Sequence, residues 1–283
     1  MKFVKMQGLG NDYIYIDAIN QKIENREELA RKISDIHFGI GSDGMILICK
    51  SEIADYKMEI YNADGSQAEM CGNGIRCFGK FLYENNFTKK KEIKVETLCG
   101  IKTLYLNVKE NKVNSVTVDM GNPILEANKI PTTIEKDIIR NYPLIINNKE
   151  FKINCVSMGN PHTIIFTNDL EKMDIRRYGK EIEKNSYFPN RTNVEFAQIL
   201  NRNTVKIYVW ERGTGETLAC GTGACATVVA GVINGYLERR VKVFLKGGNL
   251  LVEWGKNNKI YLTGPAATVC KGETKICIKL LTF

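Results

Sequence analysis

The sequence predicts an α+β protein built from two pseudo-symmetric domains, each a curved mixed β-sheet or barrel wrapped around one central helix. One observation behind this prediction is the motif Cys-Gly-x-Gly, which begins at Cys71 and again at Cys220, 149 residues later. The same spacing relates further pairs of positions: Asn11 and Asn160, Asn62 and Glu211, and residues 41–44 and 190–193. One spacing held at separate places indicates two copies of one unit.

The other observation concerns the segments that follow the two cysteines. Residues 224–233 are apolar on nearly every face of a helix, and residues 75–82 are only slightly less so. A helix that is apolar all round must be buried all round. Short alternating runs, which predict strands, surround both segments. We therefore expect each copy to be a sheet around one helix, with the cysteine at the N-terminus of that helix.

The remaining elements follow from local patterns. In the first copy, strands are predicted at residues 3–7, 13–18, 57–61, 102–108 and 115–119. In the second copy, they are predicted at residues 153–157, 163–166, 194–200, 204–210, 241–245, 250–254 and 260–263. Residues 27–36 and 175–184 predict amphipathic surface helices.

The domain boundary is predicted at Gly121-Asn122-Pro123, where turn residues end a strand and the repeat restarts. The predicted domains are therefore residues 1–121 and 122–267. The strand-like segment 275–280 has no counterpart in the second copy. We expect residues 268–283 to return and complete the first domain.

Composition agrees with an ordinary enzyme, since 283 residues can form two domains that each bury a core. Nine cysteines without scaffold spacing favour reduced thiols. Residues 1–5 lack an apolar signal-peptide core and no apolar segment is long enough to cross a bilayer, so we expect a cytoplasmic protein without membrane contact. The net charge is +8, but its densest run, residues 89–91, has no interleaved aromatics, so we expect no nucleic-acid partner.

A thiol at a helix N-terminus lies near unpaired backbone amides and the positive end of the helix dipole, which lower its pKa. Glycines beside it let the same amides approach a carboxylate. One isolated motif of this kind is more simply a buried turn, whereas two in register favour reactive cysteines.

Three chemistries are open to two such thiols. Zinc is disfavoured because the cysteines form no Cys-x-x-Cys pairs and His37 and His162 are the only histidines. Redox exchange usually employs cysteines two residues apart on one loop. The remaining chemistry is acid–base work on opposite faces of one carbon, in which a thiolate removes a proton and the facing thiol returns one.

Several blocks of the chain resemble the diaminopimelate epimerase family. The two signatures of that family are matched by residues 62–66 with 69–77 and by residues 210–225 of this chain. Further blocks of the family are matched, in the same order, by residues 10–12, 159–162 and 191–194. The resemblance extends from residue 3 to about residue 265. It implies an isomerase that interconverts LL- and meso-2,6-diaminoheptanedioate for lysine and peptidoglycan-precursor biosynthesis. It also implies two similar domains, no cofactor or metal, and a homodimer.

The resemblance assigns roles to individual residues. It implies that Cys71 and Cys220 are the acid–base pair, and that Gly72, Asn73, Gly221 and Thr222 offer backbone amides to the carboxylate of the reacting centre. The substrate's amino groups and far carboxylate would be held by Asn11, Asn62, Asn160, Asn193, Glu211 and Arg212. Arg212 suits a bidentate contact with a carboxylate, and Glu211 suits an ammonium.

Four positions are less determined by the resemblance. His162 either tunes a cysteine, lines the pocket or is a structural histidine. Glu211 is a further candidate for tuning activity. His37 matches no block, and we treat it as structural. Gly44 stands where some family members place a glutamine that touches substrate, so that contact is either absent here or made by backbone.

Two other functions are compatible with the two cysteines. A proline or hydroxyproline racemase of the same design would not need Arg212 and several asparagines at the remote end of its substrate. A non-catalytic binding module would not need both cysteines intact.

Overall fold

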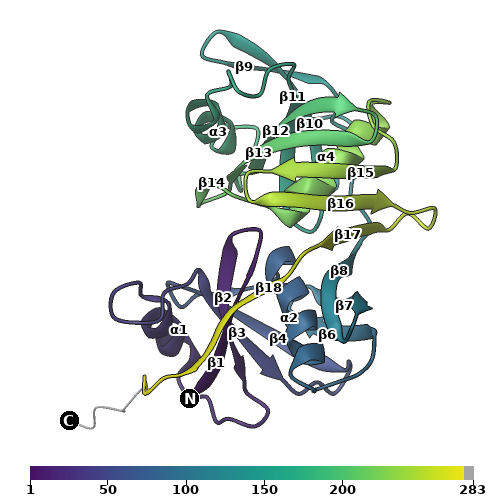
Figure 1. Cartoon of the computed structure of the whole chain (residues 1–283). Helices are drawn as coiled ribbons and strands as arrows, with labels where there is room; N and C mark the ends of the chain where they lie inside the picture. The colour runs from purple at the N-terminus through teal and green to yellow at the C-terminus, as the bar shows by residue number, and fades with distance from the viewer. Residues whose placement is uncertain (277–283) are drawn as a thin grey trace. The chain divides into compact units, whose positions relative to one another are not determined.

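The computed structural model describes residues 1–276, which divide into two compact units (Figure 1). Unit 1 comprises residues 1–118 and the described residues from Gly264 onward, and unit 2 comprises residues 119–263. In both units strands predominate over helices, so the predicted α+β class is confirmed.

Unit 1 is one mixed sheet with two helices. Its elements are β1 (Lys2–Gly8), β2 (Asn11–Asp17), α1 (Arg26–Ser34), β3 (Gly44–Cys49), β4 (Tyr56–Asn62), β5 (Gln67–Ala68), α2 (Gly72–Glu84), β6 (Glu92–Thr97), β7 (Gly100–Lys109), β8 (Lys112–Gly121) and β18 (Ala267–Glu273). The main strands pair in the order β18-β1-β2-β3-β4-β6-β7-β8. Pairs β2–β3 and β4–β6 are parallel, and the others are antiparallel.

Unit 2 has the same plan. Its elements are η1 (Ala127–Lys129), β9 (Tyr142–Ile146), β10 (Lys149–Ser157), β11 (Pro161–Phe166), α3 (Ile175–Glu183), β12 (Asn193–Asn201), β13 (Thr204–Glu211), β14 (Gly215–Thr217), α4 (Gly221–Ile233), β15 (Arg240–Leu245), β16 (Gly248–Trp254) and β17 (Ile260–Gly264). The strand order is β9-β10-β11-β12-β13-β15-β16-β17, with β11–β12 and β13–β15 parallel.

The repeat read from the sequence is therefore present in the backbone. Helix α4 begins and ends 149 positions after α2, which is also the spacing of the two cysteines, and α3 follows α1 at the same spacing. The pattern of parallel and antiparallel pairs is the same in both units. Strand β9 occupies in unit 2 the place that β18 occupies in unit 1.

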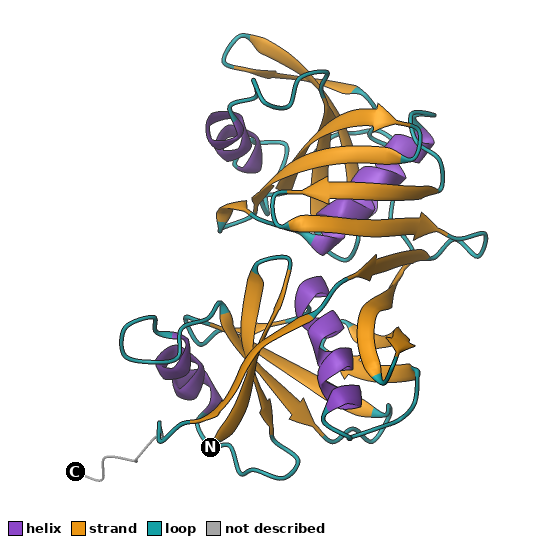
Figure 2. Ribbon diagram, in the orientation of Figure 1, coloured by secondary structure: helices purple, strands orange, loops and turns teal. Residues whose placement is uncertain are grey.

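The two central helices are buried as predicted. Helix α2 packs on β1, β2 and β7, and α4 packs on β10, β11, β12 and β16. Figure 2 shows α4 lying against the strands of its own unit. From Gly223 to Gly231 every residue of α4 is buried, which explains why its sequence is apolar on all faces.

The outer helices cover the opposite face of each sheet. Helix α1 packs on β3 and β4 through Leu29, Ala30 and Ile33, and α3 packs on β12, β13 and β14. In α3, a Cβ at Gly179 would lie 2.7 Å from Trp210 Cβ, so glycine is needed for this close approach. The predicted amphipathic helices are confirmed, although α1 ends two residues earlier than expected.

Strands β3, β6 and β9, the short strands β5 and β14, and β18 at residues 267–273 were not predicted. All six residues of β3, Gly44–Cys49, are buried, and a continuous apolar run does not show the alternation by which strands were sought. At the C-terminal end, β18 pairs antiparallel with β1. Of the strand predicted at residues 275–280, Lys275 and Ile276 lie outside any strand and the rest lies outside the described residues. None of the helices within residues 1–276 is long and apolar enough to span a bilayer.

Candidate active site

Both motif cysteines are helix N-caps. Cys71 precedes α2 and Cys220 precedes α4, and each has an extended backbone with ψ 116°. The Cys71 sulfur accepts a hydrogen bond from the Gly74 amide at 3.3 Å, and the Cys220 sulfur accepts one from the Gly223 amide at 3.4 Å. Each sulfur therefore lies at the positive end of a buried helix, beside the amides of its first turn.

The last glycine of each motif lies in close contact with a side chain of a neighbouring strand. A Cβ at Gly74 would lie 2.8 Å from Ile46 Cδ1, and a Cβ at Gly223 would lie 2.4 Å from Glu195 Oε1. Ile46 lies on β3 and Glu195 lies on β12, at corresponding positions of the two units. In each unit, the start of the central helix therefore packs against the equivalent strand, β3 or β12, and this contact holds the motif amides in place.

Half-site 1 denotes Cys71 with Asn11, Tyr13 and Asp43 in unit 1. The Cys71 thiol donates to Asn11 Oδ1 at 3.2 Å, and Asn11 Nδ2 donates to Asp43 Oδ2 at 2.7 Å, which fixes the orientation of the amide. The charge that the Cys71 sulfur carries as a thiolate, followed by burial, raises the pKa of Tyr13. Tyr13 therefore remains a neutral phenol that can donate to the sulfur.

A buried arginine supports the first motif. Arg76 is fully buried, and its guanidinium donates to Gly72 O at 2.8 Å, to Asn73 Oδ1 at 2.8 Å and to Pro265 O at 3.2 Å. It ties the first turn of α2 to the segment before β18, and it brings a fixed positive charge to the turn that follows Cys71.

Two other predicted positions of unit 1 have a clear environment. Asn62 is half-buried at the end of β4, where its Nδ2 donates to Ser66 Oγ at 3.0 Å across a tight turn. A Cβ at Gly44 would lie 2.2 Å from Tyr61 O and 2.9 Å from Tyr13 Cε1. No side chain fits at Gly44, so this position can offer a ligand only its backbone.

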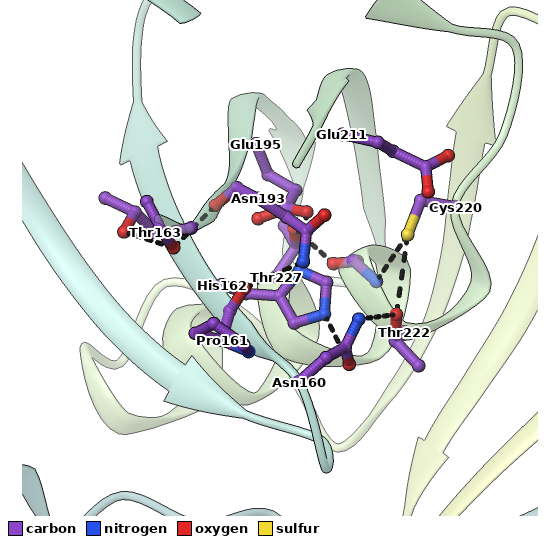
Figure 3. A network of polar contacts seen from close by, with 12 residues as sticks. Asn160, Pro161, His162, Thr163, Asn193, Glu195, Glu211, Cys220, Thr222 and Thr227 are labelled. Carbon is purple, nitrogen blue, oxygen red and sulfur yellow. Dashed lines mark hydrogen bonds and ion pairs between the residues drawn. The ribbon is translucent and has the colours of Figure 1, made fainter. Parts of the chain in front are cut away.

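Half-site 2 denotes Cys220, Thr222, Asn160, His162 and Glu195 in unit 2, and Figure 3 shows these side chains converging. Thr222 Oγ1 lies 3.4 Å from the Cys220 sulfur and 3.2 Å from Asn160 Nδ2. His162 Nε2 lies 3.1 Å from Asn160 Oδ1, and His162 Nδ1 lies 2.7 Å from Glu195 Oε1. The side chains of His162 and Glu195 are both fully buried.

The turn after β13 carries the candidates for the far end of a substrate. Glu211 Oε1 accepts from Thr217 Oγ1 at 2.6 Å, and burial raises the pKa of Glu211. Asn193 is buried, accepts from the Arg212 amide at 2.9 Å and donates to Pro161 O at 2.8 Å. The Arg212 side chain is exposed, with one guanidinium nitrogen 3.3 Å from Asn190 O. Asn193 therefore braces the turn that presents Arg212.

One expectation about reactivity is wrong for Cys220. Its position at a helix N-terminus predicted a lowered pKa, but burial, followed by the charges of Glu211 and Glu195, raises the pKa of Cys220 well above its usual range. The Thr222 hydroxyl and the Gly223 amide act in the opposite direction. Desolvation outweighs the helix terminus here because the sulfur is removed from water.

Within each unit, the structure brings most predicted residues together around the cysteine, and it adds others that sequence reasoning missed. These are Tyr13, Asp43, Arg76, Glu195 and Thr217. A glutamate between Val194 and Phe196 in an apolar strand was an available signal for Glu195. His37 is exposed after α1, so it is not part of a core.

Comparison with known proteins gives consistent matches over nearly the whole chain. The family model described as "Diaminopimelate epimerase" matches residues 3–126 and 154–269. The chain is 52% identical to a diaminopimelate epimerase of Acetivibrio thermocellus, over 98% of this chain and 99% of that protein. It is 53% identical to a diaminopimelate epimerase of Methanococcus maripaludis, over 98% of this chain and all of that protein.

Solved structures share the fold at low sequence identity. A hydroxyproline epimerase from Agrobacterium vitis, with bound trans-4-hydroxy-L-proline, matches with a TM-score of 0.69 and 14% identity, over 96% of this chain and 90% of that chain. A phenazine biosynthesis protein of the PhzF family from Bacillus anthracis matches with a TM-score of 0.69 and 19% identity, over 98% and 99%. The two-unit fold is thus shared with racemases and related proteins.

Proposed function

This chain belongs to the diaminopimelate epimerase family and is an isomerase, and from this premise we propose how its residues perform the reaction. The proposed reaction interconverts LL- and meso-2,6-diaminoheptanedioate, within lysine biosynthesis, by inverting one α carbon. The observation that carries the mechanism is the presence of a cysteine at the N-cap of both central helices, at the two places where the family signatures occur.

In the proposed mechanism, Cys71 and Cys220 act on opposite faces of the α carbon. The thiolate of one cysteine removes the α proton, and the electron pair of the broken C–H bond passes into the adjacent carboxylate. The thiol of the other cysteine then delivers its proton to the opposite face, so the two cysteines end the turnover with exchanged protonation states. The amides of Gly72, Asn73, Gly221 and Thr222 stabilise the charge that develops on the carboxylate.

The remaining predicted residues are proposed to bind the rest of the substrate. Arg212 would pair with the far carboxylate, since its guanidinium is exposed and its backbone is braced by Asn193. Glu211 would accept from an ammonium group. We further propose that Asn11, Asn62 and Asn160 contact the substrate. Asn193 Nδ2 uses one of its two hydrogens in the bond to Pro161 O, and we propose that it donates the other to the substrate.

The rival activity is racemisation of proline or hydroxyproline. The structural match to a hydroxyproline epimerase concerns the fold alone, whereas a cyclic imino acid with one carboxylate would leave Arg212 without a partner. The test is the entry of solvent deuterium at the α carbon of LL-diaminopimelate, with proline and hydroxyproline assayed in parallel. Exchange with diaminopimelate alone is expected, and exchange with proline alone would overturn the assignment.

We also propose that the enzyme acts without a cofactor, as a homodimer and in the cytoplasm, as the family resemblance implies. The motif amides supply the stabilisation that a cofactor would otherwise provide. Dialysis against a chelator is expected to leave the activity unchanged, and light scattering of the purified protein is expected to give the mass of two chains. Loss of activity that returned on adding metal would contradict the first statement.

A further inference from the structure

The side chains of half-site 2 form one continuous line of contacts that ends on the Cys220 sulfur. It runs from Glu195 through His162 and Asn160 to Thr222, with successive distances of 2.7, 3.1 and 3.2 Å, and reaches the sulfur at 3.4 Å (Figure 3). The four residues come from three adjacent elements, β11 with the turn before it, β12 and the first turn of α4.

The donors and acceptors along this line determine its direction. Asn160 donates through Nδ2 to Thr222, so Asn160 Oδ1 is the atom that faces His162 Nε2, and an oxygen acceptor there requires an N–H on the histidine. His162 Nδ1 faces a second acceptor, Glu195 Oε1, so a proton lies between these two atoms as well. His162 and Glu195 are therefore either an imidazolium and a carboxylate, or a neutral imidazole with its proton on Nε2 and a protonated carboxyl that donates to Nδ1.

At the Cys220 end of the line, Thr222 can donate in the same direction as Asn160. Thr222 accepts from Asn160, so its own hydroxyl proton is available to donate to the Cys220 sulfur when that sulfur is a thiolate. From His162 Nε2 onward, the donors in the line can therefore all point toward the sulfur, an arrangement that favours the thiolate of Cys220. Hydrogen bonds linked in this way polarise one another, so a change at Glu195 is felt at the sulfur.

The fold itself does not require the buried pair. In unit 1, Tyr13 occupies the position of His162 and Ile46 occupies the position of Glu195, and the backbone there has the same elements in the same order. A buried ion pair is often no more stable than apolar residues of similar volume. Among residues 1–276, Glu195 Oε2 is also the one buried side-chain N or O atom without a hydrogen-bond partner. Such a costly group is better explained by its effect on His162 than by stability.

We propose that Glu195 is a positioning residue for the epimerase, which acts through His162, Asn160 and Thr222 to stabilise the thiolate of Cys220. The role of Glu195 in catalysis rests on the proposed function, whereas the protonation of the Cys220 sulfur can be measured without turnover. The direct charges of Glu211 on β13 and of Glu195 itself raise the pKa of Cys220, and the Gly223 amide of α4 lowers it. In the proposal, the effect of Glu195 through the line of contacts outweighs this direct effect of its charge. Glu211 and the Gly223 amide remain in place in the variants below.

The main test is the variant Glu195→Gln, which keeps the shape of the side chain and removes the carboxylate that faces His162 Nδ1. The rate of alkylation by iodoacetamide is measured against pH for Cys220 and for Cys71 in the same full-length protein, by peptide mass mapping. We expect the midpoint for Cys220 to rise by about one pH unit, which corresponds to a tenfold loss of thiolate at a given pH. The midpoint for Cys71 should not move, so half-site 1 is an internal control.

Two further variants test the route. Thr222→Val removes the last donor and keeps the backbone amide, and it should raise the Cys220 midpoint in the same direction. In the Thr222→Val background, Glu195→Gln should have little additional effect, because the line is already broken. Glu59→Gln is the matched control, since Glu59 is a buried glutamate of unit 1 that pairs with Arg26 and not with a residue of either half-site.

The outcomes are distinct. An unchanged Cys220 midpoint in Glu195→Gln overturns the proposal, and so does a fall, because a fall would mean that Glu195 acts only as a nearby negative charge. In turnover, kcat should fall about tenfold with a smaller change in KM, as expected for one charge-assisted hydrogen bond. If Glu195→Gln does not fold, Glu195→Ile, which copies Ile46, is measured instead with the same expected rise. If the unaltered protein fails to exchange the α proton of diaminopimelate, the proposed function fails, whereas the alkylation result still decides the role of Glu195.

Discussion

Half-site 1 and half-site 2 place a cysteine at the same point of the same fold, but different polar groups surround the two sulfurs. At half-site 1 the oxygen of Asn11 accepts from Cys71, whereas at half-site 2 the hydroxyl of Thr222 can donate to Cys220. A two-base epimerase needs one thiol and one thiolate at the same time. We infer that the repeat kept the backbone that cradles a carboxylate, while the groups that hold the protons diverged.

The two units also differ where they would meet the far end of a substrate. At the repeat spacing, Asn62 of unit 1 corresponds to Glu211 of unit 2, and Ala63 corresponds to Arg212. The two charged residues that are proposed to bind an ammonium and a carboxylate therefore have no charged counterpart at the equivalent positions of unit 1. A symmetrical fold thus carries an asymmetrical set of charges, which suits a substrate with one reacting end and one recognised end.

The largest expected effect is the same for both half-sites. Cys71→Ala and Cys220→Ala should each lower epimerase turnover by about 10³-fold or more, since a methyl group cannot transfer a proton and inversion needs a group on each face. Circular dichroism should show an unchanged fold for both. If either variant kept near-normal turnover, the two-base mechanism would be wrong.

The next largest effect is expected from a substitution in unit 2. Arg212→Ala should lower kcat/KM for diaminopimelate by about 10²-fold, or ~3 kcal/mol, because a substrate carboxylate loses its charged partner. The control is Lys90→Ala, which removes an exposed lysine paired with Asp55 on the surface of unit 1 and should change kcat/KM by less than about twofold. Equal small effects would place recognition of the far carboxylate elsewhere.

Glu211→Gln should separate binding from proton chemistry at half-site 2. Burial is the largest cause of the raised pKa of Cys220 and the charge of Glu211 is the next, so removing that charge should move the pH midpoint of Cys220 alkylation downward. This shift is opposite to the one expected for Glu195→Gln. The value of kcat/KM should fall about tenfold through the lost contact with an ammonium. An upward shift of the midpoint would contradict this account of the Cys220 environment.

The smallest effect is expected at half-site 1. Tyr13 stays protonated because the Cys71 sulfur and burial raise its pKa, so it contributes at most one neutral hydrogen bond. Tyr13→Phe should lower kcat by about threefold to tenfold. Iodoacetamide mapping should show a small upward shift of the Cys71 midpoint and none for Cys220. A loss as large as that of Cys71→Ala would show that the phenol itself transfers protons.

The sequence by itself determined the repeat, the class of fold and the place of the two cysteines. These follow from local facts, because a spacing of 149 residues, an apolar helix and a Cys-Gly-x-Gly motif can be read without knowing what packs on what. Residues named from the family signatures, such as Asn160 and Glu211, also lie in the expected units. The domain boundaries and the roles of these residues remain predictions.

Only the tertiary structure decided which side chains act together. Strand β3 was missed because burial on both faces removes alternation, and Glu195 was missed because its partner His162 lies 33 positions away in the sequence, on the neighbouring parallel strand. The raised pKa of Cys220 was likewise beyond the sequence. A helix terminus is a local feature, whereas burial and the charges of Glu211 and Glu195 come from strands that the fold brings to the sulfur, and these outweigh it.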